Sequence, residues 1–429
     1  MLKYLWTVTQ DLFVVVTLVT WLHAVLGRLY GRAGRRFNAA GIIAGVAASA
    51  ALAAVKGTTN KIISSHWNHY IFAAISILSL LFVVFCLIFG RHENGGRGVG
   101  GTLLCLFGAG LSAAHIFYAL PGVMLYPFNF NTMGEGYLSA YYMTRLAGWL
   151  LALVLLLVYS RTLYVCALHI RPLSTLSALL CGGVLVNLFY SGGRFFAPWV
   201  TRAKWLKWPV RYSKESHALI GNWLSVTVNH SMVFVWLIFA LAAASLVICF
   251  VQNTKVIEPW DNPAQHRKLR ARNRSRRCTA CVAFGGLIAF SLCLTLVKDY
   301  DTRVIELSAP ETYTVDGDKI LVPIDTVNDF HLHRFEYKTE NDVNVRWIVV
   351  RKPNSAAYGV GLDACDVCGN AGYYERNGLV VCRRCDVVMN TSTIGFKGGC
   401  NPIPITYEVD SGNLVFHLSE IEAGEREFK

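Results

Sequence analysis

The sequence predicts a membrane all-α bundle of about eight transmembrane helices, followed by a small β-rich domain with a four-cysteine metal knuckle. Three observations predict it. The 429 residues are 54% hydrophobic with a mean hydropathy of +0.41, which is typical of an integral membrane protein with a soluble part. Apolar runs close to the length that a bilayer requires recur almost to residue 300. Two C-x2-C pairs follow in the remaining part.

Charge divides the chain at the same place. Residues 300–429 hold 20 of the 27 acidic residues but only 13 of the 40 Lys and Arg residues. The net charge of +13 therefore comes from the membrane part, where it is typical of cytoplasmic loops, and it does not indicate a nucleic-acid partner. We expect a polytopic transmembrane domain at 1–299 and an extracytoplasmic, β-rich, metal-binding domain at 300–429.

The apolar runs give the helices in order. We expect them at 12–26, 38–55, 71–89, 103–120, 144–159, 173–189, 233–251 and 278–297. The two densest arginine clusters, 28–36 and 267–277, fall on the same side of this arrangement. Since Lys and Arg mark cytoplasmic loops, both chain termini are expected outside the membrane, with membrane lipid around the bundle.

One predicted outer segment, 194–214, is basic and rich in tryptophan. Such a segment more often lies flat in the membrane interface than spans it. The alternative is that it docks the acidic tail or an acidic partner.

Three histidines, His23, His115 and His230, lie inside or at the ends of apolar runs. Pairs of neutral imidazoles on facing helices hold b-type haem, so these residues are candidate haem b ligands. The alternative is that they are polar helix-packing or interfacial residues. Cys278 and Cys281 form a further C-x2-C at the start of the last run, where ordinary helix cysteines are favoured over a reactive thiolate pair.

The strongest motif is Cys365-x2-Cys368 followed by Cys382-x2-Cys385. Each tight turn points two sulfurs at one ion, and two turns brought together by a hairpin complete a tetrahedral sulfur set. Such a set suits zinc, a single iron or an iron–sulfur cluster. The alternatives are a structural zinc without redox work and two ordinary disulfides.

Four secondary candidates surround this motif. His331 and His333 are two residues apart, so on a strand both imidazoles face the same way and can bind a metal or face an electron acceptor; the alternative is a surface strand. Met389 is either a soft ligand suited to copper or a core residue. Cys400 is a fifth ligand, a packed thiol or a disulfide partner.

The C-terminal part resembles a known family. Residues 362–369, 382–388 and 393–404 carry the similarity, which covers about the last hundred residues closely. They resemble the bacterial "Fe–S-containing" multi-pass membrane proteins that are associated with high-affinity iron permeases and periplasmic iron-binding proteins. The resemblance implies a bacterial inner-membrane location with periplasmic termini, those two proteins as partners, and the four cysteines as ligands. The electron donor is not indicated.

Together these features predict a membrane-anchored, metal-binding redox protein that supports iron uptake. It would pass electrons to iron, or handle iron, at the outer face of the inner membrane. One alternative is a non-redox metal-delivery or assembly subunit with a structural zinc. A metal transporter is a third hypothesis, weakened because no acidic residue lies within the predicted apolar runs.

Overall fold

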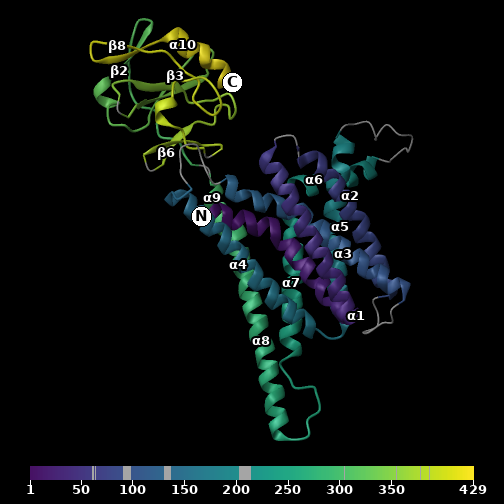
Figure 1. The fold of residues 1–429 in the computed structure, drawn as a ribbon. Coiled ribbons are helices and arrows are strands. Elements are labelled where there is room, and N and C mark those ends of the chain that lie inside the picture. The colour runs from purple at the N-terminus through teal and green to yellow at the C-terminus, as the bar shows by residue number, and fades with distance from the viewer. Residues whose placement is uncertain are drawn as a thin grey trace. The chain divides into compact units, whose positions relative to one another are not determined.

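The computed structural model describes residues 1–59, 62, 64–89, 98–129, 137–201, 214–303, 305–353, 355–376, 378–385 and 387–429. The chain divides into two compact units (Figure 1). One comprises residues 1–130 and 140–301, and the other comprises 131–139 and 302–429. The first is helical and the second is β-rich, as the sequence predicts.

The helical unit contains seven helical stretches, among the described residues, that are long and apolar enough to cross a membrane. Its helices are α1 Leu2–Thr58, α2 Ser64–Phe89, α3 Val99–Leu125, α4 Ala140–His169, α5 Leu173–Thr201, α6 Lys214–Asn229, α7 Met232–Gln252 and α8 Pro263–Leu292. The short turn η1 Tyr126–Asn129 follows α3, and a π-helical turn Cys293–Val297 joins α8 to α9 Lys298–Thr302. All but the short α6 and α9 belong to the seven stretches.

Helix α1 contains both of the first two predicted helices. Gly31 interrupts it with φ 61° and ψ −131°, a conformation that only glycine adopts readily. Asn38 Nδ2 lies 3.4 Å from His23 Nδ1 although 15 residues separate them, so the chain folds back at Gly31. The prediction of about eight helices thus counts the two arms of α1 separately.

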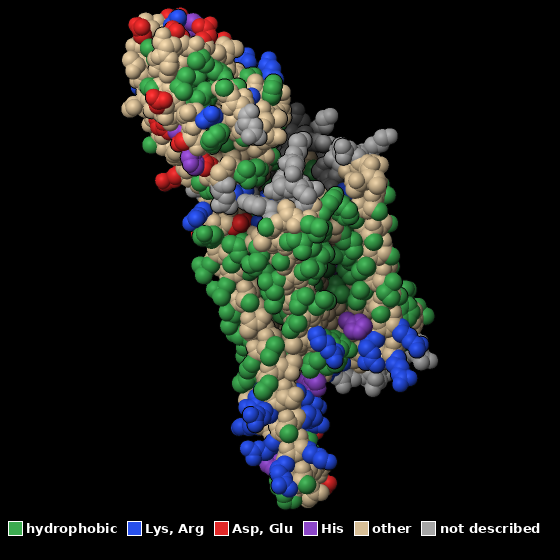
Figure 2. All heavy atoms as spheres, turned by 60° about the vertical axis from the view of Figure 1, so that its left-hand side comes forward, with side chains coloured by type: hydrophobic (Ala, Val, Ile, Leu, Met, Phe, Trp, Pro, Cys, Tyr) green, Lys and Arg blue, Asp and Glu red, His purple; other side chains and the backbone are tan. Residues whose placement is uncertain are grey.

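Basic turns meet at one end of the helical unit. Arg28 of α1 donates to the carbonyl of Ile170 after α4. Arg171 pairs with Glu258 at 3.5 Å, and Arg272 of α8 donates to the same carboxylate. Figure 2 shows Lys and Arg side chains gathered at this end, next to a band of hydrophobic side chains. The grouping agrees with the predicted cytoplasmic side, while the orientation itself stays a prediction.

The core of the helical unit contains packed aromatic rings, and apolar side chains also cover much of its outer surface (Figure 2). Phe13, Trp21 and Tyr159 are almost fully buried, and Phe13 stacks on Phe239 with ring centroids 3.9 Å apart. Large hydrophobic side chains also face outward, for example Leu157, which is 69% exposed. An outward-facing apolar surface of this kind suits lipid. The loop predicted to lie in the interface falls largely on residues 202–213, which lie outside the described residues.

The β-rich unit contains two antiparallel sheets and a hairpin. The first sheet has the order β1-β2-β9-β8, the second has the order β3-β4-β5, and β6 pairs with β7. The strands are β1 Thr314–Asp316, β2 Lys319–Pro323, β3 His333–Lys338, β4 Asn344–Arg351, β5 Tyr358–Leu362, β6 Tyr373–Arg376, β7 Leu379–Cys382, β8 Glu408–Asp410 and β9 Asn413–His417. Helix α10 Leu418–Ala423 and the 3-10 turns η3 Ile324–Thr326, η4 Thr391–Thr393 and η5 Gly424–Glu427 complete the unit.

Strand β4 is buried on both faces. Trp347 lies in the main core, with ring centroids 5.6 Å from Phe335 of β3 and 6.0 Å from Phe416 of β9. Its neighbours Ile348 and Val350 belong to a second, smaller core that also contains cysteines. Since side chains alternate along a strand, the apolar run of β4 supplies both cores. The small core that contains the cysteines therefore packs against one face of β4.

Candidate metal centre

The first C-x2-C turn closes on itself directly after β5. Cys365 N donates to Gly369 O at 3.1 Å, and Gly369 N donates back to Cys365 O at 2.9 Å. Gly369 has φ +66°, which glycine adopts without strain. Cys368 N donates to Cys365 Sγ at 3.1 Å. The turn thus fixes Cys365 and Cys368 side by side and supplies an N–H to a sulfur.

The second turn begins at the end of β7. Cys382 is paired with Tyr373 of β6, and its amide donates to Val387 O at 3.0 Å. The amides of Arg384 and Cys385 donate to the sulfur of Cys382. The Arg384 side chain also donates to Cys368 O at 3.2 Å, which ties the second turn to the first.

Cys400 approaches from a third segment. Leu362 N donates to Ile403 O at 2.7 Å, and Ile403 N donates to Ala364 O at 3.0 Å, so this segment runs beside the end of β5. The Tyr373 hydroxyl donates to Cys400 O at 2.6 Å. These bonds hold Cys400 over the two turns.

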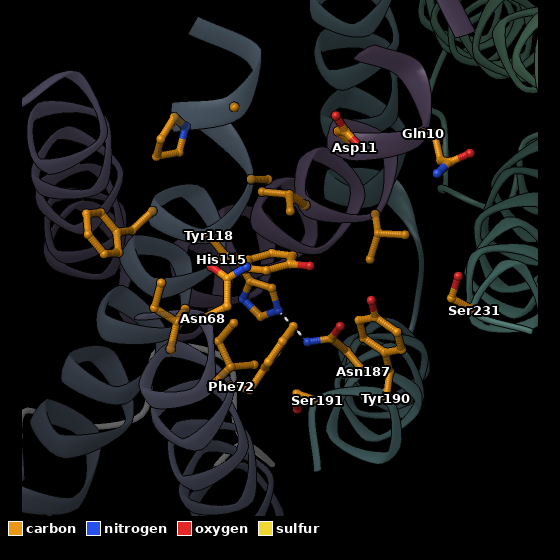
Figure 3. Close-up of a pocket in the computed structure, with 18 of the residues that line it drawn as sticks. Gln10, Asp11, Asn68, Phe72, His115, Tyr118, Asn187, Tyr190, Ser191 and Ser231 are labelled. Carbon is orange, nitrogen blue, oxygen red and sulfur yellow. Dashed lines mark hydrogen bonds between the residues drawn. The ribbon is translucent and has the colours of Figure 1, made fainter. Parts of the chain in front are cut away.

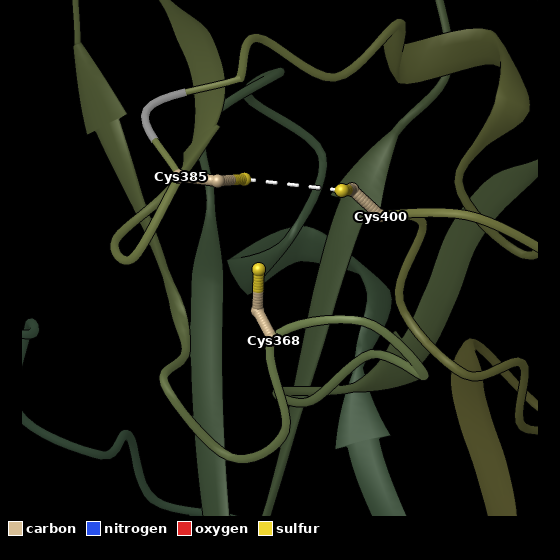
Figure 4. A group of neighbouring side chains, drawn as sticks. All are labelled: Cys368, Cys385 and Cys400. Carbon is tan, nitrogen blue, oxygen red and sulfur yellow. Dashed lines mark hydrogen bonds between the residues drawn. The ribbon is translucent and has the colours of Figure 1, made fainter. Parts of the chain in front are cut away.

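The sulfurs of Cys368, Cys385 and Cys400 all lie within 4.8 Å of one another and could hold a metal ion. Figure 4 shows the three side chains pointing toward one another from different segments. The sulfur of Cys382 is hydrogen bonded with those of Cys368 and Cys385. Cys365 joins through the amide of Cys368 and the hydroxyl of Tyr373. The structure therefore brings two of the predicted cysteines, Cys368 and Cys385, together with Cys400, while metal binding by Cys365 and Cys382 stays a prediction.

Burial and hydrogen bonds between the thiols shift their pKa values in different directions. Burial raises the pKa of the Cys368 and Cys382 thiols. Burial and the neighbouring Cys385 raise the pKa of Cys400 to about 11. Burial also disfavours ionisation of Cys385, but the Val387 amide and the surrounding thiols outweigh it and lower its pKa. Cys385 is therefore the thiol readiest to ionise, and a cation would offset the cost of burying the others as thiolates.

The sulfur spacing can be compared with that of a metal centre. A tetrahedral ion with metal–sulfur bonds of about 2.3 Å holds its sulfurs about 3.8 Å apart. Cys385 Sγ and Cys400 Sγ lie 3.8 Å apart. In a 2Fe–2S cluster two cysteines share each iron, so one pair of sulfurs has the same spacing there as on a single ion. The donor set and this spacing fit zinc, a single iron or one iron of a 2Fe–2S cluster.

The two tail histidines are held by carboxylates. Strand β3 begins at His333, so His331 precedes the strand and the two do not share a strand face. His331 Nδ1 lies 2.8 Å from Glu375, and His333 lies between Glu311 at 3.0 Å and Asp329 at 2.8 Å. Neither belongs to the cysteine group, and metal binding by them stays a prediction.

Met389 is buried in the small core around the cysteines. Its backbone N donates to Val380 O at 2.7 Å, which fixes the residue beside β7. This position suits a packing residue, and the copper-ligand alternative stays a prediction.

The three membrane histidines are separate in the structure. His23 lies beside Asn38, and His115 Nε2 lies 2.6 Å from Asn187 Nδ2. His230 is exposed in the turn between α6 and α7. Each thus has its own surroundings among the described residues, and haem b binding by these three stays a prediction. Cys278 and Cys281 are exposed on α8.

Sequence reasoning missed the groups that hold the first cysteine turn in place. Asp363, two residues before Cys365, is fully buried and pairs with Arg334 of β3. Asp363 lies within residues 362–369, one of the stretches that carry the family resemblance. The available signal in the sequence was an acidic residue two positions before the cysteine turn. Its partner Arg334 is 29 residues away, so the pairing itself left no local pattern.

A family model described as "Membrane iron-sulfur containing protein FtrD-like" matches residues 327–428. The matched stretch contains β3–β9, both C-x2-C turns and Cys400. It confirms the resemblance for this part of the chain. Comparisons with curated proteins and with solved structures gave no match.

Proposed function

We propose that this chain, whose residues 327–428 match the model of the FtrD-like membrane iron–sulfur proteins, is a membrane-anchored metal-binding redox protein that supports iron uptake. It would pass electrons to iron, or handle iron, at the outer face of a bacterial inner membrane. The family description and the seven candidate spans support the membrane and iron–sulfur parts of this proposal. An iron permease and a periplasmic iron-binding protein are its proposed partners.

The convergence of Cys368, Cys385 and Cys400 carries the proposal. The two turns fix the sulfurs through backbone hydrogen bonds, so the ligands need not move when the charge of a bound centre changes by one electron. Amides that donate to Cys365 and Cys382 stabilise negative charge on sulfur, and such bonds tune the reduction potential of thiolate centres. A bound iron centre would supply one-electron transfer.

One edge of the centre comes near the surface. Cys365, Cys368 and Cys382 are buried, whereas Cys385 and Cys400 are half-buried. Phe396, four residues before Cys400, is 60% exposed. An iron-bearing or electron-carrying partner would approach most closely at this edge.

Two alternatives remain as proposals. The 3.8 Å spacing of the Cys385 and Cys400 sulfurs also suits a structural zinc in a delivery or assembly subunit. The objection to a metal transporter needs correction, because α1 begins at Leu2 and places Asp11 inside a candidate span. One carboxylate, which accepts from Tyr126 at 2.6 Å, is still a small ligand set for a metal ion.

Spectroscopy of the purified full-length protein, with metal analysis, tests the proposal. We expect iron and a visible absorption that bleaches on reduction. The signal should be lost in Cys385→Ser and kept in Cys278→Ser, which changes an exposed cysteine of the helical unit. Protein that holds stoichiometric zinc and is colourless in both states would exclude the redox role. A Soret band would establish haem b.

A further inference from the structure

A cavity lies inside the helical unit. Its volume is about 360 Å³, within the usual range of about 300–1,000 Å³ for small-molecule sites. Helices α1, α2, α3, α5 and α7 contribute to its walls. The α1 residues that line it are near the two ends of that helix, away from the fold-back at Gly31. The cavity is therefore at the end of the unit opposite the basic turns.

Two hydrogen-bonded pairs connect α3 and α5 along this cavity. His115 pairs with Asn187, and Tyr118 pairs with Tyr190. The members are three residues apart on both helices, so the pairs are stacked one helical turn apart on one face. Figure 3 shows all four side chains around the same hollow, with Asp11 of α1 across from them.

The hydrogen bonds of His115 orient Asn187. His115 Nδ1 lies 2.8 Å from Leu111 O, a carbonyl that can only accept, so Nδ1 carries the proton. Nε2 is then an acceptor and takes a hydrogen bond from the Asn187 amide at 2.6 Å. His115 is 2% exposed, and both of its ring nitrogens are hydrogen bonded. The Asn187 carbonyl and second N–H can therefore bind a ligand.

Most of the remaining lining is apolar, with rings from Phe72, Phe117 and Phe234 and several Val and Ile side chains. Neutral polar side chains also line it, namely Gln10, Asn68, Ser191 and Ser231 (Figure 3). The charged residues that line the cavity are Asp11 and Lys56, of opposite sign. A cation site needs more carboxylates, and a phosphate site needs more basic groups. The lining suits a neutral, flat molecule with hydrogen-bonding oxygens.

We propose that this cavity binds the head group of a membrane quinone. A quinone is a planar ring with two carbonyl oxygens, which match the Asn187 amide and the Tyr118–Tyr190 hydroxyls, and its isoprenoid tail would lie among apolar helices. This inference rests on the proposed redox function, since a quinone is a redox carrier within the membrane. It concerns binding and can be tested separately.

The experiment uses full-length protein in lipid nanodiscs and a photoreactive short-chain quinone. Saturable labelling, competed by unlabelled decyl-ubiquinone or a menaquinone analogue, is expected to map to peptides of α3 and α5. Asn187→Leu and Tyr190→Phe should each weaken binding about five- to tenfold, as expected for one lost hydrogen bond. Tyr164→Phe, a change on α4 away from the cavity, and Asn229→Leu, an exposed position on α6, should bind like the wild type.

The outcomes separate the two proposals. Absence of saturable labelling, labelling elsewhere, or wild-type affinity in both cavity variants overturns the quinone site, as does competition by phospholipid alone. Size-exclusion profiles and metal content of the variants show whether they remain folded. Quinone binding without any redox-active metal keeps this inference and overturns the electron-transfer role, whereas a redox-active metal without quinone binding does the reverse.

Discussion

The guanidinium of Arg334 and the carboxylate of Asp363 form a buried ion pair, with Nε 3.0 Å from Oδ2 and side chains 1% and 0% exposed. Asp363 also accepts from Arg346 Nε at 3.3 Å and from the Tyr373 amide at 2.7 Å. Arg334 donates further to Ser308 O and Tyr373 O. The pair therefore joins β3, β4 and β6 at the residue that leads into the first cysteine turn.

Replacing one partner of this pair leaves the other buried without its counter-charge. For Asp363→Asn we expect the β-rich unit to lose about 3–5 kcal/mol. Hydrogen exchange of the β3 and β4 amides in the full-length protein measures the loss. Asp342→Asn, which breaks the exposed pair with Lys338, is the control and should change stability by under about 1 kcal/mol. Equal effects of the two changes would contradict a stabilising role for the buried pair.

His333 should make this unit more stable in mildly acidic solution. Burial disfavours its charge, but Asp329 and Glu311 outweigh burial and raise the pKa of His333 above its ordinary value. A raised folded-state pKa adds stability that is fully present below the unfolded value of about 6.5 and is lost as the pH rises through the folded value.

The opening free energy of β3 should therefore fall from about pH 6.5 upward, measured by hydrogen exchange with the intrinsic rate corrected for pH. In His333→Gln this slope should flatten. His417→Gln, at the end of β9, should keep it. If the opening free energy of β3 still fell with pH in His333→Gln, the pH dependence would come from another titrating group.

Cys400 should contribute to metal retention. Its sulfur lies 3.8 Å from that of Cys385, so Cys400→Ser is expected to weaken metal affinity at least about tenfold. Competition with a chromophoric chelator gives the affinity. Met389→Leu, a volume-conserving change in the same small core, should leave it within a factor of a few. An unchanged metal affinity in Cys400→Ser would indicate that Cys400 packs beside the site without binding the metal.

Gly31 should be required for the fold-back of α1. With φ 61° and ψ −131°, an alanine there is strained by about 1–3 kcal/mol. Gly31→Ala should lower the thermal midpoint of the full-length protein in detergent. Gly285→Ala, in α8, meets no atom within 4 Å and should leave the midpoint unchanged or raise it. A lower thermal midpoint for Gly285→Ala than for Gly31→Ala would contradict a fold-back of α1 at Gly31.

Local sequence patterns were sufficient to predict the helices and the cysteine turns. They could not predict which distant segments contact one another. Apolar run length and arginine position predicted the helices, and C-x2-C spacing predicted the two turns. Whether Cys400 joins the cysteines depends on bonds from Leu362 to Ile403 and from Tyr373 to Cys400, which link distant segments. The pairing of Arg334 with Asp363 could not be predicted for the same reason.

The start of the first helix was also misjudged from the sequence. The apolar run begins at Leu12, but the helix begins at Leu2, since helix formation does not need an apolar residue at each position. Asp11 is consequently inside a candidate span and lines the cavity. The predicted apolar run 12–26 contains no acid, but the helix extends beyond that run and includes Asp11.

Metal content of the intact protein tests the central claim most directly. Purified wild-type protein should contain a stoichiometric bound metal, detected by elemental mass spectrometry. Cys368→Ser and Cys385→Ser should lose it, and Cys278→Ser should retain it. Wild-type protein without metal, or equal metal in all four proteins, would contradict a metal centre at these cysteines.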